Sequence, residues 1–193
     1  MAKKTDNSRL EEKLRIRQEI IDITDGDVRV LECYAGRGVI WSELKRRNPN
    51  RQIRVLQIEK EKGKNVRALN GDNIKFLSVL DLEKYNVIDL DAYGIPAHQI
   101  KTISESAFEG FVCVTAIQSM QGNIPKEILK ANGITDEMSS KIKSIFNTQC
   151  IKYLKNFLYL CGVKKIRGYF LPERKNYFYY KQQKKDTTNV KNL

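Results

Sequence analysis

The sequence predicts an α/β fold with a seven-stranded sheet that is mostly parallel and ends in a C-terminal antiparallel β-hairpin. Apolar segments of strand length alternate with segments of helical pattern across residues 25–117, which is typical of a parallel sheet buried on both faces. Two later strand-like segments are joined only by a short turn at 172–175, and a connection this short requires antiparallel pairing. The chain has 193 residues and is 41% hydrophobic, which suits one such domain.

The N-terminal segment is expected to form a helix. Leu14, Ile20 and Ile21 are among the apolar residues that recur at mostly helical spacing over residues 8–23, and Asn7 or Ser8 would cap this helix. We therefore divide the chain into three parts. They are an N-terminal helix at 1–24, the main domain at 25–182 and a flexible basic tail at 183–193.

The alternating region begins with an apolar strand that runs into Gly36-Arg37-Gly38, and the helix after this turn is stopped by Asn48-Pro49. Trp41 in this helix is expected to pack onto the sheet. The expected elements are a strand at 28–35, a helix at 39–47, a strand at 52–58, a short helix at 62–69, a strand or a mixture of strand and turn at 73–80, a strand at 85–89, a helix at 97–107 and a strand at 111–117.

The pattern changes after residue 117. A short helix is expected at 125–132 and ends at Gly133, while Thr135 would cap a longer helix at 136–160 that ends at Gly162. Strands at 163–171 and 177–182 then form the hairpin.

Positive charge is concentrated in the C-terminal part of the chain. The whole chain carries 35 basic and 23 acidic residues, and residues 121–193 hold 15 of the basic and five of the acidic ones. These residues contribute +10 of the formal net charge of +12. A basic region of this size favours a polyanionic partner, most simply nucleic acid, although a solvated lysine-rich surface is the alternative.

Several classes of protein are disfavoured by the sequence. No apolar run is long enough to span a bilayer, and the N-terminus lacks the apolar core of a secretory signal. The four cysteines form no CxxC pair and His98 is the only histidine, so neither a zinc site nor a histidine-dependent nucleophile is supported. We expect a cytoplasmic protein that does not associate with membranes.

Polar residues and glycines follow the ends of the expected strands, where a sheet of this kind places its ligand site. Residues 32–38 (ECYAGRG) end the first strand in a glycine-rich turn, which lets the backbone approach a ligand closely. Glu59 ends the second strand and could accept hydrogen bonds from ribose hydroxyls, although a solvated charge is the simpler interpretation of this residue alone.

Two further clusters follow later strands. Asp72 and Asn73 could reach an adenine ring or could form an ordinary turn. Asp89 and Asp91 lie on the same face of a buried strand and precede Tyr93, and two carboxylates in an apolar setting cost free energy unless they are paired or functional.

These motifs together resemble class I S-adenosylmethionine-dependent methyltransferases. The likeness rests on ECYAGRG at 32–38, IEKE at 58–61, GDN at 71–73 and IDLDAYGIP at 88–96, in that order and spacing, and it covers residues 28–182. The last motif is similar to the strand-4 motif of the tRNA guanine-N2 dimethyltransferase family. The resemblance implies a Rossmann-like, seven-stranded methyltransferase sheet and S-adenosyl-L-methionine as the cofactor.

The resemblance also implies roles for individual residues. At the cofactor, Glu59 would hold the ribose hydroxyls, Asp72 and Asn73 would lie by the adenine, and Lys60 and Asp89 would also contribute. The residues implied at the methionine end are Glu32, Tyr34, Ala35, Gly36 and Gly38.

The implied catalytic residues are Asp91, Tyr93 and Asp89. Asp91 would accept a hydrogen bond from the exocyclic amine of the target base, and Tyr93 would stack on that base once it has left its helix. Ala92 replaces the proline of the family motif, which loosens the backbone geometry that this proline fixes.

The sequence therefore favours a methyltransferase that acts on a base in nucleic acid, with RNA ahead of DNA. Two alternatives stay open. One is a methyltransferase with a small-molecule or protein substrate, and the other is a non-catalytic nucleic-acid-binding module with the same fold.

Overall fold

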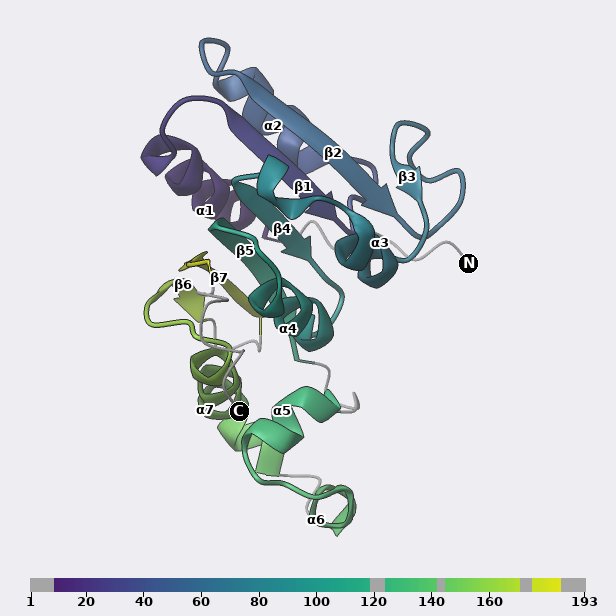
Figure 1. Ribbon diagram of the computed structural model, residues 1–193, viewed down its shortest axis with the longest axis vertical. Helices are drawn as coiled ribbons and strands as arrows, with labels where there is room; N and C mark the ends of the chain where they lie inside the picture. The colour runs from purple at the N-terminus through teal and green to yellow at the C-terminus, as the bar shows by residue number, and fades with distance from the viewer. Residues whose placement is uncertain (1–8, 119–123, 142–144, 171–174, 185–193) are drawn as a thin grey trace, which may run out of the picture.

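The computed structural model describes residues 9–118, 124–141, 145–170 and 175–184, and these form a seven-stranded sheet with helices on both faces (Figure 1). The strand order is β3-β2-β1-β4-β5-β7-β6. Strands β1 to β5 are parallel, whereas β7 pairs antiparallel with both β5 and β6. The predicted fold class is confirmed.

The first part of the chain builds most of the sheet. Its elements are α1 (Leu10–Ile23), β1 (Val28–Cys33), α2 (Val39–Arg47), β2 (Ile53–Glu59), β3 (Leu69–Asn70), α3 (Asn73–Val79), the 3-10 turn η1 (Leu82–Lys84), β4 (Val87–Asp91), α4 (Ala97–Glu105) and β5 (Gly110–Ile117). The remaining elements are α5 (Lys126–Ala131), α6 (Asp136–Lys141), α7 (Ile145–Leu160), β6 (Ile166–Phe170) and β7 (Lys175–Gln182).

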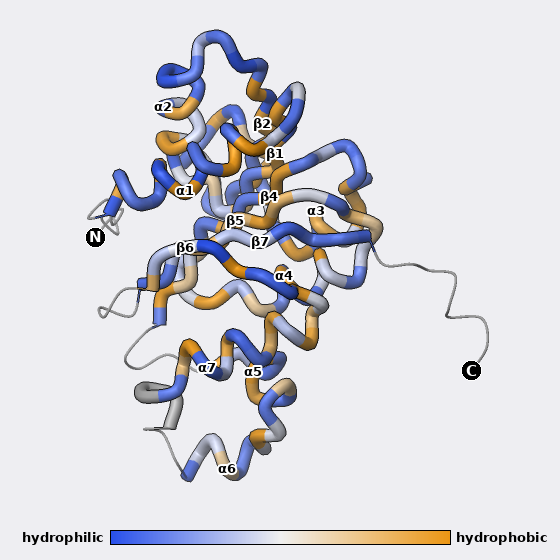
Figure 2. Tube along the Cα trace, turned by 90° about the vertical axis from the view of Figure 1, so that its left-hand side faces the viewer, coloured by the Kyte–Doolittle hydropathy of each residue, from blue (hydrophilic) through white to orange (hydrophobic). Residues whose placement is uncertain are grey.

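Alternation of side chains along the strands gives the sheet two buried faces. Val30 of β1 packs with Trp41 of α2 and the apolar side of α1, as the position of Trp41 in the sequence predicts. Leu31, the next residue, faces the opposite side and packs with Ile100 of α4 and other residues of α3, α5 and α7. Figure 2 shows hydrophobic colour along central strands such as β1 and β5 and a mixture of both colours along the helices.

Two predictions about the segment between β2 and β4 are wrong. Residues 62–69 form turns that lead into β3 instead of a helix, and Gly63 within them has φ +76°, a left-handed conformation outside a right-handed helix. Residues 73–79 form α3 instead of a strand, because the side chain of Asp72 accepts a hydrogen bond from the backbone N–H of Ile74 at 2.9 Å and caps the helix. The short β3 supplies the third parallel strand.

The other differences concern element ends. The long helix expected at 136–160 corresponds to α6 and α7, and residues 142–144 between them lie outside the described residues. The expected caps Asn7 and Ser8 lie outside them as well, as do residues 185–193 of the expected tail. No helix in the described parts of the chain is long and apolar enough to cross a membrane.

Candidate functional site

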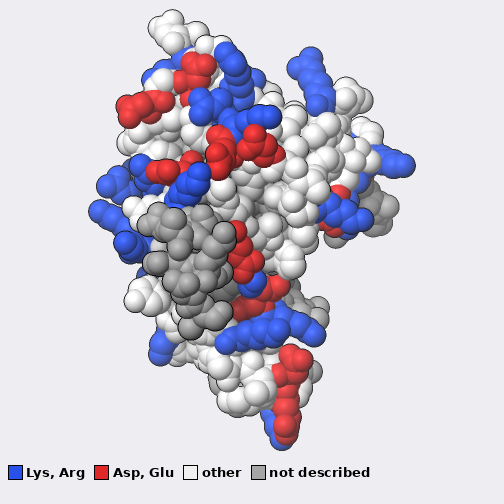
Figure 3. Space-filling view, viewed as in Figure 1, with Lys and Arg blue, Asp and Glu red and all other residues white. Residues whose placement is uncertain are grey.

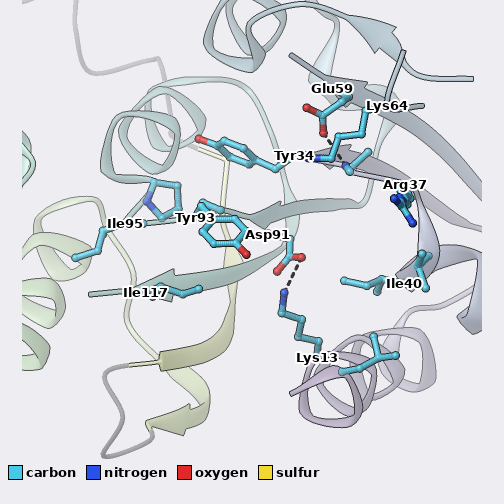
Figure 4. A pocket seen from close by; sticks show the side chains of 17 residues that line it. Lys13, Tyr34, Arg37, Ile40, Glu59, Lys64, Asp91, Tyr93, Ile95 and Ile117 are labelled. Carbon is cyan, nitrogen blue, oxygen red and sulfur yellow. Dashed lines mark hydrogen bonds and ion pairs between the residues drawn. The ribbon is translucent and has the colours of Figure 1, made fainter. Parts of the chain in front are cut away.

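A cleft of about 360 Å³ opens at the carboxyl ends of the parallel strands (Figure 4). It lies where the chain order reverses, because β2 and β3 lie on one side of β1 while β4 and β5 lie on the other. The lining residues are Leu10, Lys13, Tyr34, Ala35, Gly36, Arg37, Val39, Ile40, Glu59, Lys64, Asp91, Ala92, Tyr93, Gly94, Ile95, Pro96 and Ile117. The cleft therefore joins the ends of β1, β2, β4 and β5 to the first turns of α1 and α2.

The turn after β1 forms one wall of the cleft. Tyr34, Gly36 and Gly38 all have positive φ angles, of 65°, 56° and 70°, so the chain reverses sharply before α2 begins. A Cβ placed on Gly36 would meet no atom within 4 Å, which means that the open cleft reaches the backbone. At Gly38, where φ is +70°, a Cβ would strain the backbone and would displace the amide of Gln57, whose Nε2 would lie only 2.5 Å away.

Glu59, the last residue of β2, joins this turn to the neighbouring strand. Its Oε2 accepts a hydrogen bond from the backbone N–H of Gly36 at 2.7 Å, and its Oε1 accepts one from the N–H of Glu61 at 2.9 Å. A carboxylate has about four lone-pair positions, so each oxygen can accept a second bond from a ligand in the cleft.

Asp91, the last residue of β4, faces helix α1. Its Oδ2 accepts a hydrogen bond from Nζ of Lys13 at 2.9 Å (Figure 4), and Nη2 of Arg17 lies 3.7 Å from Oδ1. The carboxylate is 15% exposed. Burial alone would raise the pKa of Asp91, but the positive charges of Arg17 and Lys13 outweigh it and hold the pKa below its usual value. Asp91 is therefore ionised at neutral pH.

Asp89 lies deeper on the same face of β4 and does not line the cleft. It is fully buried and accepts two bonds from Arg17, from Nε to Oδ2 and from Nη2 to Oδ1, both at 2.6 Å. The indole N–H of Trp41 donates a third bond to Oδ2 at 2.7 Å. This ion pair fastens α1 and α2 to the centre of the sheet beneath the cleft.

Glu32 of β1 is also buried below the cleft. Nε2 of Gln57 donates a bond to its Oε2 at 2.7 Å. Burial, followed by the negative charge of Asp89, raises the pKa of Glu32 to about 8, so this carboxyl group is mostly protonated at neutral pH.

The residues expected near an adenine stabilise local structure instead of lining the cleft. Asp72 caps α3 and lies 4.0 Å from the exposed Nζ of Lys60. Oδ1 of Asn73 accepts a bond at 2.9 Å from Nε2 of Gln99, which also donates to the hydroxyl of Tyr34 at 2.6 Å. This bridge orients the ring of Tyr34 at the edge of the cleft.

Six of the twelve residues predicted for the site thus line the cleft. Ala92, the position where the family motif has proline, lines it too. Tyr93 is 71% exposed. The backbone after it is fixed, because the carbonyl of Gly94 accepts a hydrogen bond from the N–H of Ile117 at 2.9 Å. The six that line the cleft are Tyr34, Ala35, Gly36, Glu59, Asp91 and Tyr93, and the six that do not are Glu32, Gly38, Lys60, Asp72, Asn73 and Asp89.

Sequence reasoning missed the contribution of α1. Lys13 and Arg17 bind the two aspartates of β4 across more than 70 residues of chain. One signal was available, because Arg17 lies three residues after Leu14 and three before Ile20, on the buried side of the helix. A charged residue at such a position requires a buried partner of opposite charge.

The four cysteines are buried and free, and the described residues contain no cluster of three or more histidines, cysteines or acids that could hold a metal ion. The charged groups of the cleft are the carboxylates of Glu59 and Asp91 and the cations Lys13, Arg37 and Lys64. Bare backbone at Gly36 and Gly94, where a Cβ would meet no atom within 4 Å, adds further hydrogen-bonding surface.

Comparison with models of known protein families finds no match, and comparison with curated proteins finds none either. Solved structures, in contrast, show clear similarity. The citrinin polyketide synthase CMeT domain matches with a TM-score of 0.55 at 12% identity, and 91% of this chain covers 52% of that one. A candidate O-methyltransferase from Nostoc punctiforme PCC 73102 matches with a TM-score of 0.50 at 14% identity, over 89% of this chain and 56% of that one.

The plantazolicin methyltransferase BpumL, in complex with a monoazolic desmethylPZN analog and SAH, matches with a TM-score of 0.52 at 11% identity, over 91% of this chain and 83% of that one. The fold is that of class I S-adenosylmethionine-dependent methyltransferases. The chain spans little more than half the length of the citrinin and Nostoc proteins. The similarity to the tRNA guanine-N2 dimethyltransferases stays a prediction from the strand-4 motif.

Proposed function

We propose that this protein is an S-adenosylmethionine-dependent methyltransferase that methylates an exocyclic amine of a base in RNA. The observation that carries the proposal is the cleft at the reversal of strand order, with Glu59 on one wall and Asp91 with Tyr93 on the other. This is the place where sheets of this type bind a nucleoside cofactor.

The residues present fit such a cofactor. The backbone is bare at Gly36 and Gly94, and Glu59 retains lone pairs for ribose hydroxyls. A cleft of about 360 Å³ is also within the usual range for small-ligand sites. When bound, the cofactor supplies a methyl group activated by a sulfonium. Glu32, Asp72 and Asn73 do not line the cleft: Glu32 is buried below it, and the other two lie at the start of α3.

In this proposal Asp91 positions the acceptor. An incoming amine shares Oδ2 of Asp91 with Lys13, because this oxygen can accept two hydrogen bonds. The low pKa of Asp91 keeps it ionised, so it orients the amine by accepting a hydrogen bond, and the amine proton passes on to water. The exposed ring of Tyr93 offers a stacking surface for a base outside its helix.

Nucleic acid is favoured as the substrate by charge. Arg37 lies at the cleft and forms no ion pair within the described part of the chain, and residues 121–193 add most of the net positive charge. A small-molecule substrate is the second candidate. It is favoured by the similar structures, which include a polyketide synthase domain and a plantazolicin methyltransferase.

The test is methyl transfer from methyl-tritiated S-adenosylmethionine to total cellular RNA or genomic DNA. Label that survives DNase but not RNase would support the proposal, and calorimetry with S-adenosylhomocysteine would measure cofactor binding separately. Absence of cofactor binding would refute the methyltransferase proposal. Cofactor binding without label in either polymer would favour the small-molecule candidate.

A matched pair of variants tests the role of Asp91. Asp91→Ala is expected to reduce transfer at least about a hundredfold, the usual range for a lost acid–base or acceptor group, while cofactor affinity stays within a few-fold. Asp25→Ala removes a charge from an exposed loop and is expected to change neither property. Full transfer by Asp91→Ala would exclude Asp91 as the group that accepts the hydrogen bond of the amine.

A further inference from the structure

A second cavity of about 410 Å³ lies at the opposite end of the sheet from the cleft. Phe111 at the start of β5 lines this cavity, whereas Ile117 at the end of the same strand lines the cleft. We call it the basic pocket and define it by its lining residues, which are Ile23, Phe111, Gly162, Lys164, Lys165, Arg167, Tyr179, Tyr180, Lys181 and Gln183.

The basic pocket collects positive charge without compensation. Its charged lining residues are Lys164, Lys165, Arg167 and Lys181, and no aspartate or glutamate lines it. All four are exposed, and none forms an ion pair within the described ranges. Figure 3 shows basic side chains along the left-hand edge of the molecule, at the level of α1 and β6 in Figure 1.

Acidic residues lie near the pocket but do not line it. Glu83 forms an ion pair with Lys184 at 3.0 Å, beside the pocket. Four cations of like charge around one hollow repel one another, so their arrangement is electrostatically unfavourable until an anion approaches. A ligand with closely spaced negative charges would relieve this repulsion.

Buried aromatic rings lie beneath these cations. The rings of Phe111 and Tyr179 meet edge to face with centroids 6.1 Å apart on the α1 side of the sheet. Tyr179 and Tyr180 are 3% and 1% exposed, neither hydroxyl has a hydrogen-bond partner among the described residues, and Tyr180 packs on the opposite side of the sheet. The buried rings give the cations a rigid base, and lysine and arginine side chains are the groups that nucleic-acid-binding proteins use to contact phosphates.

We propose that the basic pocket binds the phosphate backbone of the nucleic acid whose base enters the cleft. This inference rests on the proposed function. It gives the nucleic acid two points of contact, the cleft and the basic pocket, which are separated by the length of β5. Six residue steps at about 3.3 Å place Phe111 about 20 Å from Ile117. The rise per base pair is about 3.4 Å in B-form DNA and smaller in an A-form RNA duplex, so a substrate must extend at least about six base pairs from the target base to reach both.

The test compares two sets of variants with equal loss of charge. The pocket variant carries Lys164→Gln, Lys165→Gln, Arg167→Gln and Lys181→Gln. The control variant carries Lys45→Gln, Lys75→Gln, Lys126→Gln and Lys130→Gln, all at exposed positions that line neither cavity. Circular dichroism would establish that both variants fold, and a fluorescent RNA hairpin of about 20 base pairs, titrated over a range of salt concentrations, serves as the probe.

The pocket variant is expected to bind the hairpin at least about tenfold more weakly than the control. The slope of log affinity against log salt is expected to fall by about two to four, because each lost phosphate contact removes about 0.9 from it. Equal losses in both variants would overturn the inference, since they would show an unspecific effect of net charge. Unchanged affinity of the pocket variant would overturn it too.

Transfer measurements separate this inference from the proposed function. If the wild-type protein methylates RNA but the pocket variant binds and methylates it normally, only the basic pocket is wrong. If the wild-type protein binds the hairpin through the pocket yet transfers no methyl group to RNA or DNA, the pocket stands and the proposed function fails. A hairpin shortened to about three base pairs cannot span about 20 Å, so wild type and pocket variant should transfer methyl groups to it equally slowly.

Discussion

Replacing Arg17 with methionine should destabilise the protein more than any surface substitution, because it leaves a buried charge without its partner. Arg17 is 1% exposed and donates two bonds of 2.6 Å to Asp89, which is fully buried. The indole N–H of Trp41 would remain as the only hydrogen-bond donor to Asp89 in the described structure. Breaking a buried pair in this way typically costs about 3–5 kcal/mol, a large part of a total stability of about 5–15 kcal/mol.

The assay is urea unfolding followed by circular dichroism. With a slope of about 2 kcal/mol per molar, a loss of about 4 kcal/mol would lower the midpoint by about 2 M. Arg15→Met, on the exposed side of the same helix, is the control and should change stability by less than about 1 kcal/mol, since the Arg15–Glu19 pair is solvent-exposed.

A double variant gives the sharper test. Arg17→Met with Asp89→Leu removes both charges and should recover part of the stability that Arg17→Met loses, because no unpaired charge stays buried. Two results would refute the assignment of this pair as the buried anchor of α1. One is that Arg17→Met unfolds at the same urea concentration as the control. The other is that the free energy of unfolding lost by the double variant equals the sum of the losses of the two single variants.

Two further predictions concern neighbouring groups. Lys13→Met should raise the pKa of Asp91, because it removes a positive charge 2.9 Å from the carboxylate. Carbon-detected NMR titration of the carboxyl group would measure the change. An unaltered titration would contradict the cause given for the lowered pKa. Glu32→Gln should flatten the pH dependence of stability. The pKa of Glu32 is about 8 in the folded protein and exceeds its pKa in the unfolded chain, so the folded state binds an extra proton between these two values. The stability of the wild-type protein therefore falls between about pH 4.5 and about pH 8, by up to about 1.4 kcal/mol per pH unit. Urea midpoints at about pH 5, 6.5 and 8 would reveal this fall, and an identical fall in the variant would show that another group causes it.

The parts of the fold that the sequence predicts well are those set by local patterns. The apolar run of β1 followed by Gly36-Arg37-Gly38 marks a strand, a turn and a helix, and the short link between β6 and β7 allows only antiparallel pairing. The same holds for Asp89 and Asp91, which lie on one face of β4 as strand alternation requires.

The parts that sequence reasoning missed depend on contacts between distant residues or on ambiguous local signals. Asp72 can begin a helix or form a turn, and only the hydrogen bond to Ile74 shows that it begins α3. For the candidate site, nothing in the local sequence places Lys13 next to Asp91, because 78 residues separate them. Glu32 and Asp89, predicted at the cofactor, are buried below the cleft, and the sequence does not show how deep in the sheet a strand residue lies.

The position of β7 has a consequence for synthesis of the chain. This last strand lies between β5 and β6, and its Tyr177 and Tyr179 complete the core under α1, the first helix. Until β7 is made, one edge of β5 is unpaired and the apolar side of α1 lacks the part of its packing that Tyr177 and Tyr179 supply. At about 5–20 residues per second, translation from Ile117 to Gln182 takes about 3–13 s. The nascent chain thus carries an open β-sheet edge for seconds, and such an edge is a template for pairing with other chains.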